Sequence, residues 1–588
     1  MWTARSRARA TGMVVSMTLT LSLLAGAGCQ EETKKPVERP AGTMEQAQMR
    51  QIALATARRG TIGGVAYPEG GLRLMRVRGY GLVTGLVDKG SRRCPESLRN
   101  YLIDAIRRTR MSDPYRRKTG FEPTAAEMID SPDTAVVLVE AQIPAGAIKG
   151  RRFDVRVTAV DEETQSLVGG VLLQTELKVF QSLSPAAILE GRTLAQAGGP
   201  IFINPFREAT ATAAVIHQRE GSIIAGGIAT EDRKLSLATV TESYATVRQI
   251  QDAINTRFKA DPPTASADSP RTIGLRVPAA YRGREGRFLE LLLHLPLGGG
   301  AEVQARAKIL AAELSQPDAP HKELALSLEG IGRPAIDFIR PLYAHANRQV
   351  NSAAATAGVR LNDAAAIDVI VRHANDPRSP YRYQAIRELG ECQTVPRAAA
   401  ALRELLDGDD AQVRVLAYES LRMVDRRAVA QTIVGERIEN FLLEIVPTKG
   451  RPMIYVRRTK APRIALIGGD RMECRPPLLC ADAESPVTLT AKDGDQMVAI
   501  LRKDPARTLG PYYTSLSVPV LTRFLGSDLR TEIGGKLQGL GLDYGSVVAV
   551  LYRLCSAGAI NADMKWEEPG SDELLGPLQP VGRPESEL

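Results

Sequence analysis

The chain has 588 residues, of which 44% are hydrophobic and 24% are charged. This composition is typical of folded proteins, so it excludes a wholly disordered or collagen-like chain, and the length allows several domains. Aromatic residues make up only 5%, which argues against a nucleic-acid partner held by exposed rings, and the formal charge of +9 is not concentrated in any basic run.

The first 28 residues have the pattern of an export signal. Three arginines precede an uncharged stretch that Ser and Thr interrupt too often for a permanent membrane span. Small residues then lead to Cys29, and this arrangement resembles a lipobox. We therefore expect a signal peptide over 1–28 and lipid attachment at Cys29. Ordinary cleavage, with Cys29 uninvolved, is the alternative. The polar residues that follow predict a tether or linker over 29–70.

The first folded block is predicted over 71–302. Apolar residues recur with helical spacing from Pro95 to Arg108, which predicts a helix. A β-branched run from Thr134 to Glu140 predicts a buried strand, and strict alternation from Phe153 to Ala159 predicts a half-buried one. These features together predict an α+β fold.

The second block, predicted over 303–437, contains helical patterns only. Residues 376–382 align with 408–414 after a shift of 32, and Ala385 and Ala417 keep the same period. A fixed period with an Asp-rich turn is similar to short HEAT-type repeats, which stack into a solenoid and present a surface for protein contacts. An unrelated helical bundle is the alternative.

The third block, predicted over 438–565, returns to a mixed pattern. Strands are expected at Arg463–Ile467 and Val487–Thr490, and Asp543 can cap a helix that ends near Gly558. The remaining residues, 566–588, are acidic and rich in Pro and Gly, so we expect a disordered tail there.

No constellation of catalytic residues is evident. The five histidines lack metal-ligand spacing, and neither a nucleophile elbow nor a phosphate loop occurs. We therefore expect no catalytic, cofactor-binding or metal site. Cys474 and Cys480 flank a proline turn, so a disulfide between them is one possibility and two separate thiols the other. A cell-wall-modifying enzyme stays open as an alternative function, but it would need two converging carboxylates that the sequence does not reveal.

Several segments resemble one family, the bacterial flagellar P-ring proteins. The resemblance is carried by Arg-Val-Arg-Gly-Tyr-Gly-Leu-Val-Thr-Gly-Leu at 76–86, by the ordered segments 135–144, 150–157 and 166–177, and by Leu-Gly-Leu-Asp-Tyr-Gly-Ser-Val-Val-Ala-Val-Leu at 540–551. The helical block has no counterpart in the family's pattern. The resemblance therefore implies P-ring-type α+β domains interrupted by an all-α HEAT-like segment.

The resemblance also implies a structural role without a cofactor. Members of this family form a periplasmic ring of identical subunits around the flagellar rod, associated with peptidoglycan, and the ring acts as a bushing. The partners it implies are further copies of the chain, the rod, L-ring proteins and peptidoglycan, with a membrane lipid anchor if Cys29 is acylated. An envelope-anchored scaffold lipoprotein that uses the same fold outside a flagellum is the alternative.

Overall fold

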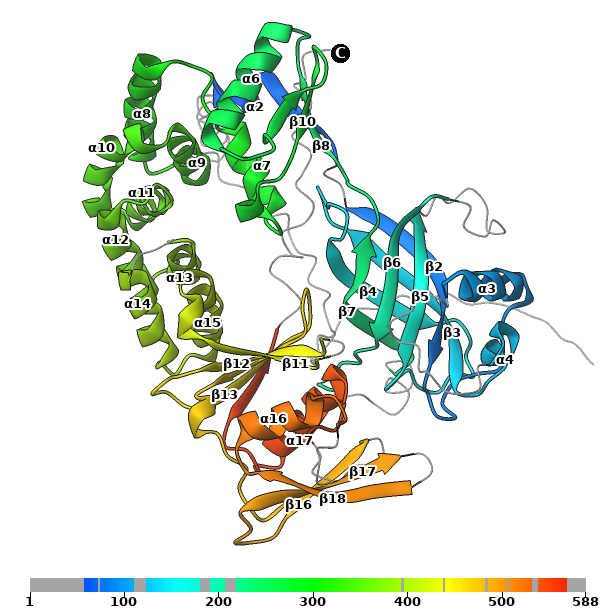
Figure 1. Cartoon of the computed structure of the whole chain (residues 1–588). Coiled ribbons are helices and arrows are strands. Elements are labelled where there is room, and N and C mark those ends of the chain that lie inside the picture. The colour runs from blue at the N-terminus through cyan, green and yellow to red at the C-terminus, as the bar shows by residue number, and fades with distance from the viewer. Residues whose placement is uncertain are drawn as a thin grey trace, which may run out of the picture. The chain divides into compact units, whose positions relative to one another are not determined.

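The chain divides into two units, and the computed structural model describes residues of the second, Arg50–Leu588. The described residues are 58–71, 74–109, 123–179, 191–206, 218–392, 396–436, 439–481, 485–504, 507–530 and 538–567. Strand-rich parts and a helical part are both present (Figure 1), so the predicted α+β class is confirmed. Within these ranges no helix combines the length and apolarity that crossing a bilayer requires.

Six antiparallel strands close into a barrel in the order β2-β3-β4-β7-β6-β5. Their bounds are β2 Met75–Thr84, β3 Thr134–Ile143, β4 Arg152–Ala159, β5 Val171–Val179, β6 Thr193–Pro200 and β7 Glu220–Ala229. Phe153, Val155 and Val157 of β4 are buried and alternate with more exposed residues, as the period of a strand with one inward face requires. The strands predicted at 134–140 and 153–159 are confirmed.

Two helices, α3 (Glu96–Thr109) and α4 (Ala125–Ile129), pack against the barrel. Leu98, Leu102 and Ile106 form the buried stripe of α3 and belong to one cluster with residues of β2 and β3. The predicted helix at 95–108 is therefore confirmed, and its apolar spacing has the expected cause, which is burial of one face.

A second sheet has the strand order β1-β8-β10-β9. Its strands are β1 Ala66–Gly70, β8 Leu235–Thr239, β9 Ala265–Ala267 and β10 Thr272–Leu275. The helices that share its core are α2 Ile62–Val65, α6 Tyr244–Arg257 and α7 Glu285–Leu293. Ile62 and Ala66 are buried in its core. The predicted linker over 29–70 is thus wrong at its end, because β1 pairs with β8, far along the chain, and this pairing leaves no local sequence pattern.

The helical repeats follow. Their main helices are α8 Gly300–Leu314, α9 His321–Ile331, α10 Ile336–Ile339, α11 Arg348–Arg360, α12 Ala364–Asn375, α13 Arg382–Glu391, α14 Pro396–Leu406 and α15 Ala411–Val424. Ala385 and Leu389 of α13 and their period mates Ala417 and Leu421 of α15 are all buried in one core. The 32-residue period therefore marks equivalent helices.

A five-stranded sheet follows in the order β11-β12-β14-β13-β19. Its strands are β11 Ala430–Val434, β12 Phe441–Val446, β13 Met453–Arg457, β14 Arg463–Ile467 and β19 Asp563–Trp566. One face shares a hydrophobic core with the repeat helices, and the other shares a core with two C-terminal helices, α16 (Val518–Gly526) and α17 (Tyr544–Ser556). The predicted tail begins too early at 566, because Trp566 belongs to β19.

The last sheet is antiparallel, in the order β15-β16-β17-β18. Its strands are β15 Leu478–Cys480, β16 Val487–Ala491, β17 Met497–Asp504 and β18 Arg507–Ser515. One face packs on α16 and α17 in a common core (Figure 1). The strand predicted at 463–467 is β14, the one at 487–490 is β16, and the helix that Asp543 caps is α17, so all three are confirmed.

Candidate functional site

The described histidines occupy packed positions. His294, His321 and His373 are buried, and desolvation lowers the pKa of each imidazole, which favours the neutral form. The ring of His373 lies 2.8 Å from both the Ser379 hydroxyl and the Asn351 side-chain oxygen. In the described part of the chain, no group of three or more His, Cys, Asp or Glu residues could hold a metal ion.

Two predictions concern cysteines: lipid attachment at Cys29, and a disulfide between Cys474 and Cys480. Cys29 lies outside the described residues. Cys474 and Cys480 are both buried thiols, without the predicted disulfide between them. Their backbones are held by different partners, since Cys480 pairs with Leu489 in the sheet and Cys474 bridges to Ile560 after α17. Burial raises the pKa of the Cys474 thiol to about 12, so it is protonated and unreactive at neutral pH.

Asp154, on strand β4 of the barrel, bonds through its carboxylate to the turn between β13 and β14, which we group with the later elements as the C-terminal block. It accepts a backbone N–H bond from Ala225 at 2.8 Å and two contacts from the backbone N–H of Lys460 at 2.8 and 3.0 Å. Lys460 has a φ of 65°, in the left-handed region, and the contacts to Asp154 help to hold this strained turn in place. Burial raises the pKa of Asp154, and the N–H donors oppose that effect.

The same turn is also held by Glu567. This carboxylate accepts bonds from the Arg457 guanidinium and from the backbone N–H groups of Arg458 and Thr459, each at 3.0 Å, and from the Thr459 hydroxyl at 2.9 Å. Burial opposes ionisation, but Arg457 and the N–H donors together lower the pKa of Glu567. Glu567 was predicted to lie in the loose tail, and this set of bonds corrects that prediction.

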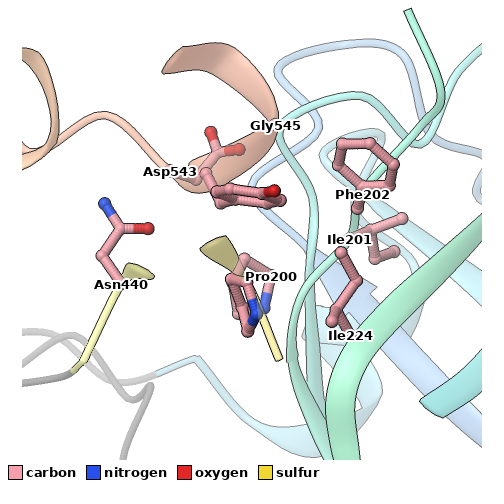
Figure 2. Close-up of a pocket in the computed structure, with 9 residues that line it drawn as sticks. Pro200, Ile201, Phe202, Ile224, Asn440, Asp543 and Gly545 are labelled. Atoms are coloured by element: carbon pink, nitrogen blue, oxygen red, sulfur yellow. The ribbon is translucent and has the colours of Figure 1, made fainter. Parts of the chain in front are cut away.

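A small pocket lies beside this junction. Its lining residues are Pro200, Ile201, Phe202, Ile224, Asn440, Pro462, Asp543, Tyr544 and Gly545. Figure 2 shows Phe202, Ile201 and Ile224 on one side of it and Asn440 on the other. The cavity volume is about 30 Å³, which suits a water or two and is far below the size of a substrate site.

Two aromatic side chains, Phe202 and Tyr544, line this pocket. The Tyr544 hydroxyl donates to the carbonyl oxygens of Arg457 at 2.5 Å and Arg463 at 3.0 Å, and its ring centroid lies 5.7 Å from that of Phe202. Nearby, the ring of Phe206 stacks on Trp566 at 4.3 Å. Such contacts between the barrel and the C-terminal block make the pocket part of a packed joint, which suits a structural role better than ligand binding.

Ion pairs join the second sheet to the helical repeats. Arg287 of α7 pairs with the buried Glu329 of α9, and Arg284 pairs with Glu391 at the end of α13. Glu329 also lies 3.8 Å from Arg360, whose guanidinium forms a two-bond pair with Glu388 at 2.8 Å. Because Glu329 and Glu388 are buried and paired, these contacts resist separation of the repeats from α7.

A second charged cluster joins the repeats to the five-stranded sheet. The fully buried Glu444 of β12 accepts bonds from the Tyr418 hydroxyl and, at 2.6 Å, from Arg422, both on α15. Arg463 of β14 lies 3.6 Å from Glu444 and bonds to Glu419 at 2.5 Å. Burial raises the pKa of Tyr418, so its hydroxyl stays protonated and acts as a donor.

The antiparallel sheet formed by β15, β16, β17 and β18 leaves one face uncovered, which we name the open sheet face. Its side chains include Leu479, Thr488, Thr490, Met497, Ala499, Leu501, Lys503, Thr508, Tyr513 and Ser515. The register places Leu479, Thr490, Ala499 and Tyr513 side by side across the four strands. Lys503, at the end of β17, is the charged member of this set, and the others are apolar or hydroxyl side chains.

The barrel, the mixed sheets and the repeats define a multidomain protein whose conspicuous features are contact surfaces. Residues 67–313 match the family model of the flagellar P-ring protein, and residues 336–422 match HEAT repeats. The resemblance to the P-ring family is therefore confirmed for the barrel and second sheet, and the repeats are of the HEAT type. The resemblance at 540–551 lies outside the matched residues.

Curated relatives carry the same description. A flagellar P-ring protein of Ralstonia nicotianae is 28% identical over 290 residues, covering 45% of this chain and 72% of the relative. That of Oleidesulfovibrio alaskensis is 27% identical over 238 residues, covering 39% and 58%. That of Geobacter metallireducens is 29% identical over 231 residues, covering 37% and 56%. The chain thus spans somewhat more than half the length of most of these relatives.

Proposed function

We propose that this chain is a structural subunit of the periplasmic P ring of the bacterial flagellar basal body. The match of residues 67–313 to the flagellar P-ring protein family carries the proposal. Copies of the chain assemble around the flagellar rod and serve as a bushing for rotation. Their further partners are peptidoglycan and the L-ring proteins.

The proposal includes export and anchoring. The signal pattern of residues 1–28 directs the chain to the periplasm, and Cys29 receives a lipid that tethers it to a membrane. Replacing Cys29 with Ser tests the anchor: the variant should leave the membrane fraction and lose labelling by a radioactive fatty acid. Unchanged labelling would contradict lipid attachment at this residue.

The proposal assigns no chemical reaction to the chain. In its support, burial raises the pKa of the Cys474 thiol, so this group lacks the thiolate form that a nucleophile requires. Incubation of the purified chain with peptidoglycan should release no soluble fragments.

Basal bodies provide the direct test. A tagged chain, expressed at its own locus, should copurify with detergent-extracted basal bodies, and electron microscopy should show label at the periplasmic ring. A deletion strain should lose that ring and its motility. Basal bodies that retain an intact P ring without this chain would overturn the proposal.

A second candidate is an envelope-anchored scaffold lipoprotein that uses the P-ring fold outside a flagellum. The HEAT repeats at 336–422 favour it, because such repeats present surfaces for binding other proteins. In that case the tagged chain would be abundant in the envelope but absent from basal bodies, and the deletion strain would swim normally.

A further inference from the structure

We propose that strand β11 is a binding edge through which two copies of this chain pair, with their β11 strands antiparallel about a two-fold axis. Each copy adds its β11 to the five-stranded sheet of the other, so the two sheets become one. The inference goes beyond the proposed ring and does not rest on it, because a two-fold contact joins two copies whether or not other contacts close a ring. In a ring, such a contact would join two layers of subunits face to face.

Strand β11 forms one edge of the five-stranded sheet. It pairs with β12 over Ala430–Val434, and its first four residues are exposed, with Ile433 at 58%. The repeats and the C-terminal helices already share cores with the two faces of this sheet. An edge is therefore the place where a further protein strand can extend it.

This strand lacks the features that usually block an edge. Edge strands are normally protected by proline, by charged residues, by a bulge, by short length or by covering side chains. Strand β11 has the sequence Ala-Gln-Thr-Ile-Val, without proline or charge, and its register with β12 has no shift. An exposed edge of this composition is a template for another strand.

The other edge strands that the structure describes are each blocked. Strand β18 contains Pro511, and β1 contains Pro68 next to a register shift. Strand β19 carries the exposed charges of Asp563 and Lys565. Strands β15 and β9 have three residues each, and side chains of α6 bond to N–H groups of β9. Of the described edges, β11 alone is left open.

The sequence of β11 suits pairing with itself. When Thr432 lies on the two-fold axis, it faces Thr432 of the other copy, Gln431 faces Ile433, and Ala430 faces Val434. No like charges meet, and a threonine opposite a threonine is a favourable pair across strands. By contrast, the segment 568–588 of this chain contains four prolines, so it is a poor donor of the backbone bonds that β11 offers.

The charges on either side of β11 favour the antiparallel direction. Residues 425–429, before the strand, include two arginines and one aspartate, whereas residues 435–439, after it, include two glutamates and one arginine. One end of the strand is thus net basic and the other net acidic. A two-fold axis places the basic end of each copy beside the acidic end of the other, whereas parallel pairing would bring like ends together.

The length of the strand sets the expected affinity. A pair of five-residue strands is about 17 Å long, and it buries much less than the roughly 800 Å² per partner of a standard interface. We therefore expect a weak dimer, with a Kd on the order of micromolar. Where several copies are held in one assembly, the same contact would be strengthened by effective concentration.

The first experiment is a crosslink that depends on register. The full exported chain is purified in mild detergent as wild type, as Thr432→Cys, and as the matched control Ala430→Cys. Two copies of the residue at 432 face each other with Cβ atoms about 5 Å apart, which a disulfide can span, whereas those at 430 lie about 13 Å apart along the strands.

Mild oxidation with diamide should convert Thr432→Cys to a covalent dimer and to no longer species, as read on a non-reducing gel. Ala430→Cys should give no more dimer than wild type, whose native thiols set the baseline. The crosslink also reports the pair inside a larger assembly. Equal yields from the two variants, or no dimer from Thr432→Cys, would overturn the inference.

The second experiment exchanges charges on the two-fold axis. Thr432→Lys and Thr432→Glu each place like charges opposite one another, so each alone should raise the dimer Kd by about 10-fold in sedimentation equilibrium. A mixture of the two should pair as tightly as wild type or more tightly, since lysine then faces glutamate. The control is Thr508→Lys, at an exposed threonine of the blocked edge β18, and it should leave the Kd unchanged.

Because Thr432 is exposed, both variants should keep the circular dichroism and melting temperature of wild type. A mixture that pairs no better than either variant alone would overturn the two-fold contact, and so would a wild type that stays monomeric at every concentration. Copurification with basal bodies tests the ring separately, so a failure here leaves the proposed function standing.

Discussion

Glu444 links the repeats to the sheet that follows them. It is fully buried on β12 and meets Tyr418, Arg422 and Arg463. A buried carboxylate with this many donors is stable only while all of them are present, because removal of one partner leaves the others desolvated and unpaired.

We expect Glu444→Ala to destabilise the chain by about 3–5 kcal/mol, since it leaves the buried Tyr418 hydroxyl and the Arg422 guanidinium without their acceptor. Urea unfolding followed by tryptophan fluorescence and circular dichroism measures the loss. The matched control is Glu404→Ala on α14, an exposed carboxylate whose removal should change stability by less than about 0.5 kcal/mol. Equal effects of the two variants would contradict the role of the buried cluster.

His373 makes stability depend on pH. Burial and the nearby Arg348 and Arg372 lower its pKa in the folded chain, while Asp376 opposes them. As the pH falls below about 6.5, the unfolded chain binds the proton first. Stability is therefore full at neutral pH and decreases on acidification until the folded imidazole also titrates.

The corresponding experiment compares melting temperatures at pH 7.5 and 5.5. His373→Gln should melt lower than wild type at pH 7.5, because its packing and hydrogen bonds change, but it should lose less between the two pH values. His345→Gln, at a half-buried position, serves as the control. A wild-type and a His373→Gln chain with the same pH dependence would show that His373 is not the titrating group.

The thiols of Cys474 and Cys480 allow a test of the disulfide prediction. In the folded chain both are buried, and the raised pKa of Cys474 keeps its thiol protonated. We expect iodoacetamide to modify both thiols only after the chain is unfolded. The modification should need no reductant, and peptide mass spectrometry detects it. Alkylation that requires a reductant would mean that the exported chain forms the disulfide.

At the scale of elements, the Asp-rich turn before α15 supplies a helix cap, whereas the equivalent turn before α13 does not. The Asp410 side chain accepts bonds from the backbone N–H groups of Gln412 at 3.0 Å and Val413 at 3.2 Å at the start of α15. Asp410→Ala should cost about 1 kcal/mol in urea unfolding. Its neighbour Asp409 is exposed and makes no cap bond at this helix, so Asp409→Ala should be nearly neutral. Similar losses in both variants would argue against capping.

Elements with a strong internal period could be predicted from the sequence, and those defined by a distant partner could not. The stripe of α3 and the alternation of β4 are properties of short windows, and both predictions hold. By contrast, β1 is a strand because it pairs with β8, and β19 because it pairs with β13. For the same reason the sequence did not reveal that β2 closes on β5 to make a barrel.

The contact residues were harder still to predict. Asp154 and Glu567 come from segments far apart in the chain and meet only through the turn at Lys460. No local pattern distinguishes them from solvated carboxylates. The open sheet face had a usable signal, the uncharged Val487–Thr490 strand, but its partners across the sheet depend on register.

At the scale of the whole chain, the sequence suggests that the repeats are a separable insertion, but their core continues into the sheet. The repeat helices share one cluster with the inner face of the five-stranded sheet, which contributes Val446, Met453, Tyr455, Ala465 and Ile467. The sheet is therefore covered on one face by the repeats and on the other by α16 and α17.

Deletion of residues 303–435 should consequently produce an aggregated chain and not a ring that merely lacks an arm. The deletion uncovers an apolar sheet face, and such faces associate non-specifically. Yield in the soluble exported fraction and the cooperativity of melting measure the effect, with Ile309→Lys as a control that leaves the repeats in place. A soluble deletion variant that melts cooperatively would show that the sheet does not need this cover.

The doubly covered sheet also constrains how such a chain can change over evolutionary time. A lineage that lost the helical segment would have to convert the five apolar positions of the inner face to polar ones, or acquire a new layer, in the same step. Neither half of that change is tolerable alone. Once the repeats are fused to the sheet, losing them alone exposes its apolar face, so their retention requires no further selective advantage.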